Sequence, residues 1–253
     1  MAEALHFETE VIQVVLETMD VFTFRLEIPA DVPFIWRAGQ FINLTVNTPE
    51  YGPGMERLTR AYSISSSPGE GRFLDLTVKY YEDGHVSRHL REVTYVGEVV
   101  GVEGPSGDFY FDAGAGATGT GAARRIALIG GGAGVAPLRA IARDILERGL
   151  DVDIHYLASC RTPNDMIYLA TLMAWTEHHP NLRVTHTITR PQGQGWSGPT
   201  GRIDAEKLRA CVPPESTDLY FVAGPTAMVA SVREALKKDL GVDRSRIVWE
   251  PWG

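Results

Sequence analysis

The chain has 253 residues, 44% hydrophobic and 22% charged, a composition typical of a globular protein with one large domain or two small ones. Its formal net charge of -8 argues against nucleic acids and anionic membranes as partners. No apolar run is long enough to span a membrane, and residues 1–3 begin no signal peptide, so we expect a cytoplasmic protein. Only Cys160 and Cys211 are present, which excludes a disulfide framework and a four-cysteine iron–sulfur cluster held by this chain alone.

Residues 1 to about 112 have the pattern of short β-strands at near-regular spacing, which predicts a small antiparallel barrel. Residues 36–40 and 47–58 are predicted as a turn and a loop, and 104–109 as a turn that closes the barrel. The predicted strands cover residues 11–16, 22–28, 41–46, 60–68 and 73–81.

The strand predicted from Arg60 carries a cation, an aromatic ring and a hydroxyl within four residues. Alternation places Arg60 and Tyr62 on one face and Ala61 and Ser63 on the other. An arginine can pair with phosphate, a tyrosine can stack on a ring, and a serine can hydrogen-bond a ring edge. The set therefore suits a phosphorylated ring system. On these residues alone, an ordinary half-buried strand with a surface arginine is the simpler interpretation.

A short helix is predicted over residues 84–91, inside the barrel half. Gly84 allows close approach to the backbone, and Ser87 offers a hydroxyl at the helix start. A helix N-terminus presents free N–H groups and a partial positive charge to an anion. A cap on a connecting helix explains the same residues equally well.

Residues 112–123 are small and almost uncharged, which predicts a linker. Residues 114–119 match G-x-G-x-x-G, but we reject this match because no strand precedes it and two arginines follow. From residue 124, strands and helices alternate, which predicts an α/β domain with a doubly wound parallel sheet. The predicted organisation is a barrel domain over 1–112, a Gly/Ala linker over 113–123 and an α/β domain over 124–253. The predicted strands are 126–129, 152–157, 182–188, 219–222 and 247–249, and the predicted helices are 135–148, 165–178, 204–211 and 226–240.

Two glycine-bearing turns follow strands of this predicted sheet, one at Gly130 and the other at Gly224. Ligands of such sheets bind at the carboxyl ends of the strands, where the strand order switches. We therefore expect both turns to border one binding site.

Four motifs, in this order and spacing, resemble those of the ferredoxin–NADP reductase-like family of flavoenzymes. Each motif is weak alone, but the ordered set is specific and covers nearly the whole chain. The resemblance implies a barrel domain that binds FAD, followed by a domain that binds NAD(P)H. The motifs are Arg60-Ala61-Tyr62-Ser63, Gly84-His85-Val86-Ser87, Gly130-Gly131-Gly132-Ala133-Gly134-Val135-Ala136-Pro137 and Gly224-Pro225-Thr226-Ala227-Met228.

The resemblance also implies a role for each motif. Arg60 would pair with the flavin pyrophosphate, Tyr62 would pack on the isoalloxazine, and Ser63 would lie near its N5. The glycines of the first turn would admit the nucleotide, and Pro137 would shape the following helix. Further positions implied for FAD are Ala61, Thr77, Val78, Lys79, Gly84, His85, Val86 and Ser87, and for the nucleotide Gly130, Gly131, Gly132, Ala133, Gly134, Gly224, Pro225 and Met228.

The C-terminal Glu250-Pro251-Trp252 resembles the family's terminal acid-x-aromatic sequence. The carboxylate would lie near the flavin, and the indole would cover the ring face on which nicotinamide stacks. A frayed tail is the alternative, although a tryptophan after a buried strand is costly to expose. Ala133 and Ala223 depart from the threonine and cysteine of many members. Hydride transfer should survive both departures, and its rate could differ.

Nucleotide choice depends on the residues after the second strand of the α/β sheet. Ser159, Arg161 and Arg190 fall where NADPH-preferring relatives place groups for the 2'-phosphate. No acidic residue occurs in 158–164 to pair with a ribose 2'-hydroxyl, so the sequence favours NADPH over NADH. Two solvated surface arginines are the alternative, and Tyr168 could pack on the adenine or in the core.

The resemblance implies an oxidoreductase that passes electrons from NAD(P)H through FAD to a separate one-electron acceptor. The acceptor would be a ferredoxin, a flavodoxin or an oxygenase component, on another polypeptide because the sequence stops at Gly253. A monomer is expected. The alternatives are a flavin or ferric reductase with a diffusible acceptor, an electron-transfer subunit of a larger complex, and a nucleotide-binding regulatory module.

Overall fold

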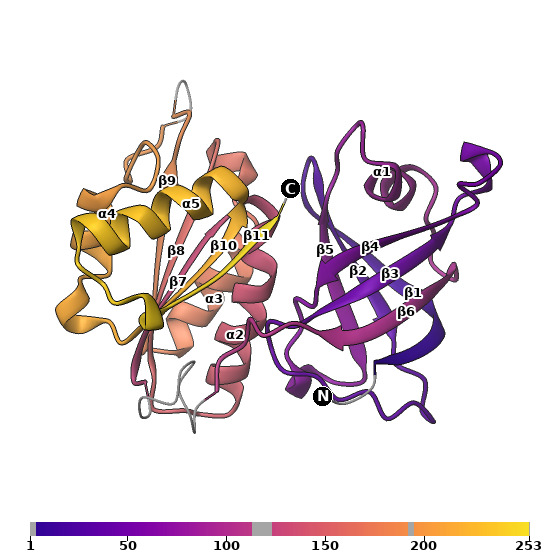
Figure 1. The fold of residues 1–253 in the computed structure, drawn as a ribbon, viewed down its shortest axis with the longest axis horizontal. Coiled ribbons are helices and arrows are strands. Elements are labelled where there is room, and N and C mark those ends of the chain that lie inside the picture. The colour runs from indigo at the N-terminus through magenta and orange to yellow at the C-terminus, as the bar shows by residue number, and fades with distance from the viewer. Residues whose placement is uncertain (1–3, 113–122, 192–194, 253) are drawn as a thin grey trace.

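The computed structural model describes residues 4–112, 123–191 and 195–252, which form two domains side by side (Figure 1). The first domain is built on an antiparallel sheet, and the second on a parallel sheet with helices on both faces. The fold class expected from the sequence is confirmed. The predicted linker and the rejected glycine motif lie almost entirely outside the described residues.

The antiparallel sheet of the first domain has the strand order β4-β3-β6-β1-β2-β5. The sheet curls until its edge strands meet at a bridge between Ile64 and Leu76. Alternate residues such as Ile42 and Leu44 of β3 point into the barrel core. The elements are β1 (Leu5–Thr18), β2 (Val21–Glu27), β3 (Phe41–Asn47), β4 (Arg57–Ser63), β5 (Phe73–Lys79), α1 (His85–Glu92) and β6 (Val99–Ser106).

Strand β6 was not predicted, although it pairs with both β3 and β1 in the middle of the sheet. The predicted turn over 104–109 is therefore wrong for its first residues, since Gly104 pairs with Leu5 and Ser106 with Phe41. Buried Val100 and Val102 carry the inward alternation of β6. The glycines and the proline that interrupt this strand concealed it, because these residues normally indicate turns.

The strand predicted over 60–68 also has different ends. It begins earlier, at Arg57, and ends at Ser63. Beyond it, Ser65 donates to the carbonyl of Asp75 at 3.0 Å, and Ser66 accepts from the N–H of Asp75 at 3.0 Å. The serines are therefore buried side chains that join the chain to β5 rather than members of β4.

The parallel sheet has the order β11-β10-β7-β8-β9, with the switch in strand order between β7 and β10. Helices α2 and α3 cover one face, where Ile126 and Leu128 are buried, and α4 and α5 cover the other, where Ala127 and Ile129 are buried. The elements are β7 (Arg125–Gly131), α2 (Val135–Glu147), β8 (Asp153–Cys160), α3 (Leu169–His178), β9 (Leu182–Ile188), α4 (Ala205–Cys211), β10 (Leu219–Pro225), α5 (Thr226–Glu234) and β11 (Ile247–Trp252).

Two predicted elements of this domain have different bounds. The helix predicted from residue 165 begins only at Leu169, because a 3-10 turn over Pro163–Asp165 comes first and Tyr168 has a φ of 62°. Strand β11 continues to Trp252, which pairs with Pro225 of β10. The alternative of a frayed C-terminal tail is therefore wrong.

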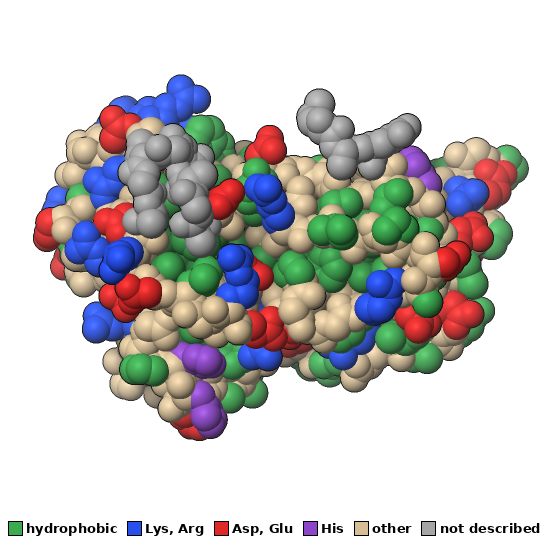
Figure 2. Space-filling model, turned by 90° about the horizontal axis from the view of Figure 1, so that it is seen from below, with side chains coloured by type: hydrophobic (Ala, Val, Ile, Leu, Met, Phe, Trp, Pro, Cys, Tyr) green, Lys and Arg blue, Asp and Glu red, His purple; other side chains and the backbone are tan. Residues whose placement is uncertain are grey.

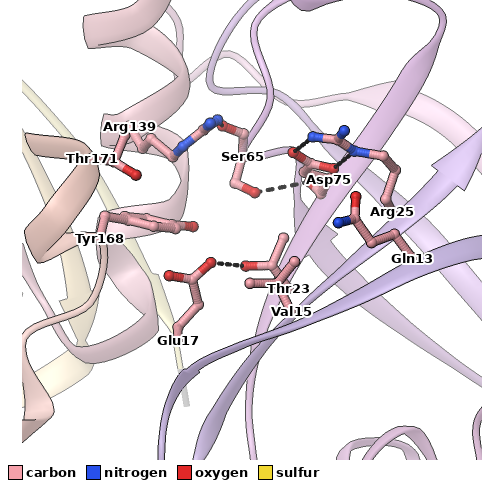
Figure 3. A pocket seen from close by; sticks show the side chains of 10 residues that line it. All are labelled: Gln13, Val15, Glu17, Thr23, Arg25, Ser65, Asp75, Arg139, Tyr168 and Thr171. Carbon is pink, nitrogen blue, oxygen red and sulfur yellow. Dashed lines mark hydrogen bonds and ion pairs between the residues drawn. The ribbon is translucent and has the colours of Figure 1, made fainter. Parts of the chain in front are cut away.

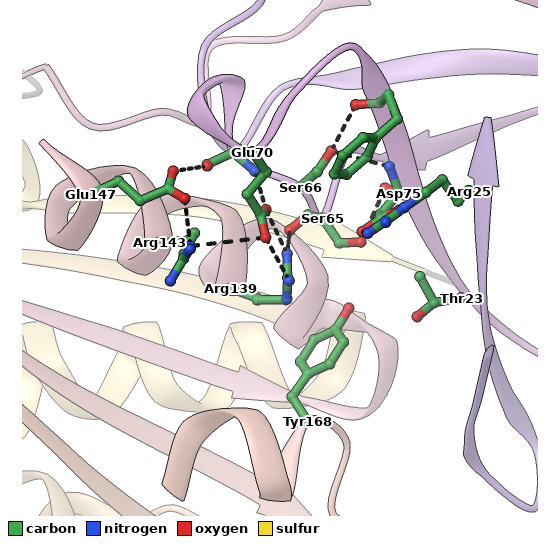
Figure 4. A network of polar contacts seen from close by, with 12 residues as sticks. Thr23, Arg25, Ser65, Ser66, Glu70, Asp75, Arg139, Arg143, Glu147 and Tyr168 are labelled. Carbon is green, nitrogen blue, oxygen red and sulfur yellow. Dashed lines mark hydrogen bonds and ion pairs between the residues drawn. The ribbon is translucent and has the colours of Figure 1, made fainter. Parts of the chain in front are cut away.

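Apolar and polar contacts join the two domains. Phe109, which follows β6, packs edge-on against Phe221 of β10, with ring centroids 5.5 Å apart. Arg139 of α2 donates to the carbonyl of Ser65 at 2.6 Å and to the Glu70 carboxylate at 3.0 and 3.1 Å (Figure 4). These contacts fix the two domains relative to each other.

A small polar cavity of about 120 Å³ lies beside this network, between β1, β2 and α3 (Figure 3). Arg25 and Asp75 form a two-bond ion pair on its barrel side, at 2.7 and 2.9 Å. The Tyr168 hydroxyl reaches from the other domain and donates to Thr77. Tyr168 therefore packs in the domain interface, as the core alternative for this residue predicted.

Candidate functional site

Two larger pockets share one wall. The barrel pocket, of about 290 Å³, lies against β4, β5 and the start of α1. The sheet-end pocket, of about 420 Å³, lies at the carboxyl ends of β7, β8 and β10. Both are lined by Lys79, Tyr81, Ala133 and Trp252. Ligands in the two pockets would therefore be neighbours.

The barrel pocket gathers residues from three segments that lie close in the sequence. Its walls include all four residues of the Arg60 motif, although strand alternation puts them on two faces. Residues from both faces of β4 can line one pocket because β4 is an edge strand, which pairs along its length only with β3. The predicted residues in its lining are Arg60, Ala61, Tyr62, Ser63, Thr77, Val78, Lys79, Gly84, His85, Val86, Ser87 and Trp252.

Arg60 of the barrel pocket is free to bind an anion. Arg60 is exposed and donates only to the carbonyl of Thr59, at 2.9 Å, with no acidic partner among the described residues. Tyr62, two residues on, is partly buried against the barrel core, and this burial raises the pKa of its phenol. The motif thus combines an unpaired guanidinium with a neutral aromatic ring.

Helix α1 directs its first turn at the same pocket. Its N-cap residue is Gly84, which has no side chain to bond the first N–H groups of the helix. The Ser87 hydroxyl donates to the carbonyl of Gly84 at 3.0 Å and accepts from the N–H of Tyr81 at 3.2 Å. Ser87 therefore fixes the turn, and the uncapped N–H groups remain for an anion.

The floor of the sheet-end pocket is backbone. A Cβ on Gly134 would lie 2.3 Å from the Cα of Gly224, so the two glycine turns touch each other directly. A Cβ on Gly131 would meet the Met228 sulfur at 2.5 Å. The predicted residues in this lining are Gly131, Gly132, Ala133, Gly134, Ser159, Arg161, Gly224, Pro225, Met228 and Trp252.

Three residues predicted for the nucleotide do not line the pocket. A Cβ on Gly130 would meet Leu138 at 2.7 Å, so this glycine lets α2 pack on the sheet. Pro137 is buried in the first turn of α2, where its missing N–H costs no hydrogen bond. Arg190 is exposed, and its backbone N–H donates to the carbonyl of Arg161 at 2.7 Å.

Arg161 is paired with two carboxylates. Its Nη2 donates to Asp20 and to Asp165, both at 3.0 Å. The segment 158–164, in which the sequence has no acidic residue, ends one position before Asp165. Asp20 belongs to the turn between β1 and β2, and no motif marks it. Exposed Arg202 also lines this pocket and was not predicted.

Trp252 at the end of β11 lines both pockets, whereas Glu250, two residues before it, lines neither. The Trp252 ring meets Phe41 edge-on, with centroids 6.3 Å apart. Neither Oε2 of Glu250 nor Nε1 of Trp252 has a hydrogen-bond partner among the described residues, although both atoms are buried. Burial raises the pKa of Glu250 to about 7, against the opposing effect of Trp252 and Ser63 nearby. Buried polar atoms normally have a hydrogen-bond partner, so both atoms can bond to a polar ligand.

Sequence comparisons agree with the division into two domains. Residues 8–111 match the oxidoreductase FAD-binding domain, and residues 128–234 match the oxidoreductase NAD-binding domain. The ferredoxin reductase of a carbazole 1,9a-dioxygenase is 30% identical, covers 99% of this chain with 70% of its own length, and superposes with a TM-score of 0.79. The chain belongs to the ferredoxin–NADP reductase-like family. Its two domains are those of NAD(P)H-dependent flavin oxidoreductases.

Other proteins similar to this chain belong to different systems. The glycine betaine monooxygenase reductase subunit of Chromohalobacter salexigens is 32% identical over 96% of the chain, which spans 63% of that protein. The cytochrome b5 reductase domain of Ulva prolifera nitrate reductase shares the fold, with a TM-score of 0.82, 22% identity and 97% coverage of both chains. In the part of the chain that the structure describes, no helix is long and apolar enough to cross a membrane.

Proposed function

We propose that this reductase passes electrons from a nicotinamide nucleotide through FAD to a one-electron acceptor protein. FAD, when bound, takes a hydride from the nicotinamide and returns its two electrons one at a time. The observation that carries the proposal is the wall shared by the two pockets. A flavin in the barrel pocket and a nicotinamide in the sheet-end pocket would meet at Trp252.

The residues of the barrel pocket fit FAD. Arg60 has a free guanidinium for a pyrophosphate, and the uncapped start of α1 offers it N–H donors. Tyr62 and Ser63 would hold the isoalloxazine, and Thr77, Val78 and Lys79 would flank the rest of the cofactor. Trp252, the residue of β11 that lines this pocket, also supports the assignment, because its buried Nε1 has no hydrogen-bond partner among the described residues and a polar ligand atom could supply one.

The chain's own part in the reaction is to position two rings and exclude water. The contact between Gly134 and Gly224 makes the pocket floor close-packed backbone, against which a flat ring can lie. Trp252 would cover the flavin and swing aside for the nicotinamide. Glu250, with a pKa of about 7, can hold a proton at Oε2 near neutral pH.

The names of the relatives support an oxygenase component as the acceptor. One serves a glycine betaine monooxygenase and another a carbazole 1,9a-dioxygenase. Because the chain spans 63% of the first of these, the activity and partner of the whole protein are part of this proposal. The domain boundaries at 112 and 124, the monomeric state and the cytoplasmic location stay predictions.

We infer that NADH is the better nucleotide, which departs from the preference for NADPH drawn from the sequence. That preference depended on a free Arg161 and on the absence of an acid nearby. Arg161 is instead paired with Asp20 and Asp165, and both carboxylates line the sheet-end pocket. A carboxylate there can accept a hydrogen bond from a ribose 2'-hydroxyl and repels a 2'-phosphate.

The test is to purify the protein, identify its bound flavin and reduce it anaerobically with NADH or NADPH. We expect stoichiometric FAD, bleaching of its visible absorbance by NADH, and faster electron transfer to a [2Fe–2S] protein than to free flavin or ferric chelates. Recovery of FMN alone, or a colourless protein that cannot be reconstituted with FAD, would overturn the proposal. Equal rates to all acceptors would favour the diffusible-acceptor alternative.

A further inference from the structure

We propose that Asp20, a residue of the FAD-binding domain, disfavours NADPH by holding Arg161 of the NAD-binding domain. This inference rests on the proposed function, since it assigns a role within its nucleotide site. The Oδ2 atom of Asp20 accepts from Nζ of Lys79 at 2.6 Å and from Nη2 of Arg161 at 3.0 Å. Lys79 lines both pockets, so one carboxylate oxygen joins a residue of the flavin site to the arginine of the nucleotide site.

Asp20 is held firmly in this position. It lies in the tight turn between β1 and β2, where Thr18 donates to its other oxygen at 3.2 Å. Its side chain is 25% exposed, and that of Lys79 is 20% exposed. Burial tends to raise the pKa of Asp20, but Lys79, Thr18 and Arg161 outweigh burial and lower it. Asp20 is therefore an anion at neutral pH.

The charges around Arg161 cancel. Arg161 and Lys79 contribute two positive charges, and Asp20 and Asp165 contribute two negative ones. Both ion pairs of Arg161 use Nη2, so its other nitrogens keep donors for a neutral ribose hydroxyl. A 2'-phosphate would therefore have to compete with Asp20 and Asp165 for Arg161, and exposed Arg202 would be the remaining cation of the described pocket lining. The arrangement therefore favours NADH over NADPH by electrostatics.

The two carboxylates differ in what holds them. Asp165 is fixed within its own loop, because it accepts from the N–H of Thr162 at 2.9 Å and from its hydroxyl at 2.7 Å. Asp20 reaches Arg161 only because the two domains are packed together. Removing its charge should leave the nucleotide loop intact, which makes Asp20 the cleaner residue to test.

The experiment compares the FAD-loaded parent and Asp20→Asn by calorimetric titration with two fragments, 2',5'-ADP and 5'-AMP. The fragments differ in the 2'-phosphate, and neither is turned over. Arg161 is about half exposed, so we expect solvent-screened electrostatics to tighten 2',5'-ADP by roughly three- to tenfold. We expect 5'-AMP to change less than about twofold. The matched control, Asp31→Asn, neutralises an exposed carboxylate of the same domain and should alter neither affinity.

Arg161→Gln, alone and combined with Asp20→Asn, tests the route. If Asp20 acts through Arg161, the gain for 2',5'-ADP disappears in the double variant. An unchanged ratio of affinities in FAD-loaded Asp20→Asn, or a gain that survives Arg161→Gln, would overturn the proposal. Asp20→Ser is made in parallel, and loss of FAD from both Asp20 variants would show that Asp20 serves the flavin site instead. Failure of the parent to bind either fragment would count against the proposed function itself.

Discussion

The two pockets differ in how their arginines are held. Arg60 has no acidic partner among the described residues, whereas Arg161 is paired with carboxylates from both domains. The sequence offered both arginines as phosphate ligands, Arg60 within a motif and Arg161 with a solvated surface arginine as the alternative. The structure separates them, because a phosphate must compete for Arg161 but not for Arg60. A motif identifies a residue, and the tertiary neighbours decide whether its charge is available.

The pockets also differ in how far apart their residues lie in the sequence. Apart from Trp252 and two alanines, the barrel pocket is lined by residues 60–87. The sheet-end pocket collects residues from Asp20 to Trp252. The barrel pocket, built mainly from local segments, should keep its ligand-binding groups when one distant contact changes. The sheet-end pocket depends on how the two domains pack.

The largest effect that would test this comparison is expected for Arg60→Ala. Loss of a free, charged hydrogen-bond donor to phosphate costs about 1.5–3 kcal/mol, so the dissociation constant for FAD should rise by roughly ten- to a hundredfold. Titration of the apoprotein with FAD, followed by quenching of flavin fluorescence, measures it.

The matched control is Arg57→Ala, which removes an exposed arginine from the same strand but outside the pocket lining. Its affinity for FAD should stay within about twofold of the parent. Similar losses in both variants would mean that Arg60 contributes only general positive charge, and the contrast with Arg161 would fail.

Much of the fold could be predicted because local pattern and tertiary structure agree. The alternating runs of β3 and β5, the glycine turns at Gly130 and Gly224, and the helix at Gly84 all occur where the sequence places them. Strand β6 escaped because Gly101, Gly104 and Pro105 resemble turn residues. Its place between β3 and β1 is set by long-range pairing, which no local window contains.

Most residues that line the barrel pocket were expected from the sequence, because its motifs are contiguous, but Tyr81 and Ala136 were not. The role of Asp20 could not be predicted, because an aspartate in a β-turn is common and its contact with Arg161 joins the two domains. Asp165 could have been identified from the sequence, because it is an acid five residues beyond the end of β8. The position of Glu250 was expected, but its raised pKa depends on burial that only the fold supplies.

A second prediction concerns the pH dependence that Glu250 of β11 gives to stability, because burial raises its pKa. Its folded pKa of about 7 exceeds the ordinary value of 4.5, so the folded apoprotein holds this proton more tightly than the unfolded chain. Its unfolding free energy should therefore fall as pH rises from about 4.5 to 7, by roughly 1–3 kcal/mol from this group.

Urea unfolding of the apoproteins of parent and Glu250→Gln at several pH values isolates this contribution, because glutamine does not titrate. The difference in unfolding free energy, parent minus variant, should decrease across that window and then level off. A difference that stays constant would show that the Glu250 carboxyl is solvated and that burial does not raise its pKa.

The smallest effect is expected for Trp252, which lines both pockets. If its indole covers the flavin, it competes with nicotinamide for the same ring face. Trp252→Ser should then tighten nucleotide binding and slow release of the oxidised nucleotide. Aromatic stacking beyond simple burial contributes about 0.5–1.5 kcal/mol, so the affinity should rise only several-fold.

The variant should also discriminate less between NADH and NADPH, because a freely docking nicotinamide adds equal binding to both. Its turnover should fall, and a charge-transfer band should form when oxidised nucleotide is added. Trp252→Phe, which keeps a ring of smaller area, should lie between the parent and the serine variant in affinity. If Trp252→Ser leaves affinity, turnover and flavin fluorescence unchanged, the indole does not lie on the flavin. The two pockets would then adjoin without competing for one ring face, and Trp252 would serve only to pack β11 against Phe41.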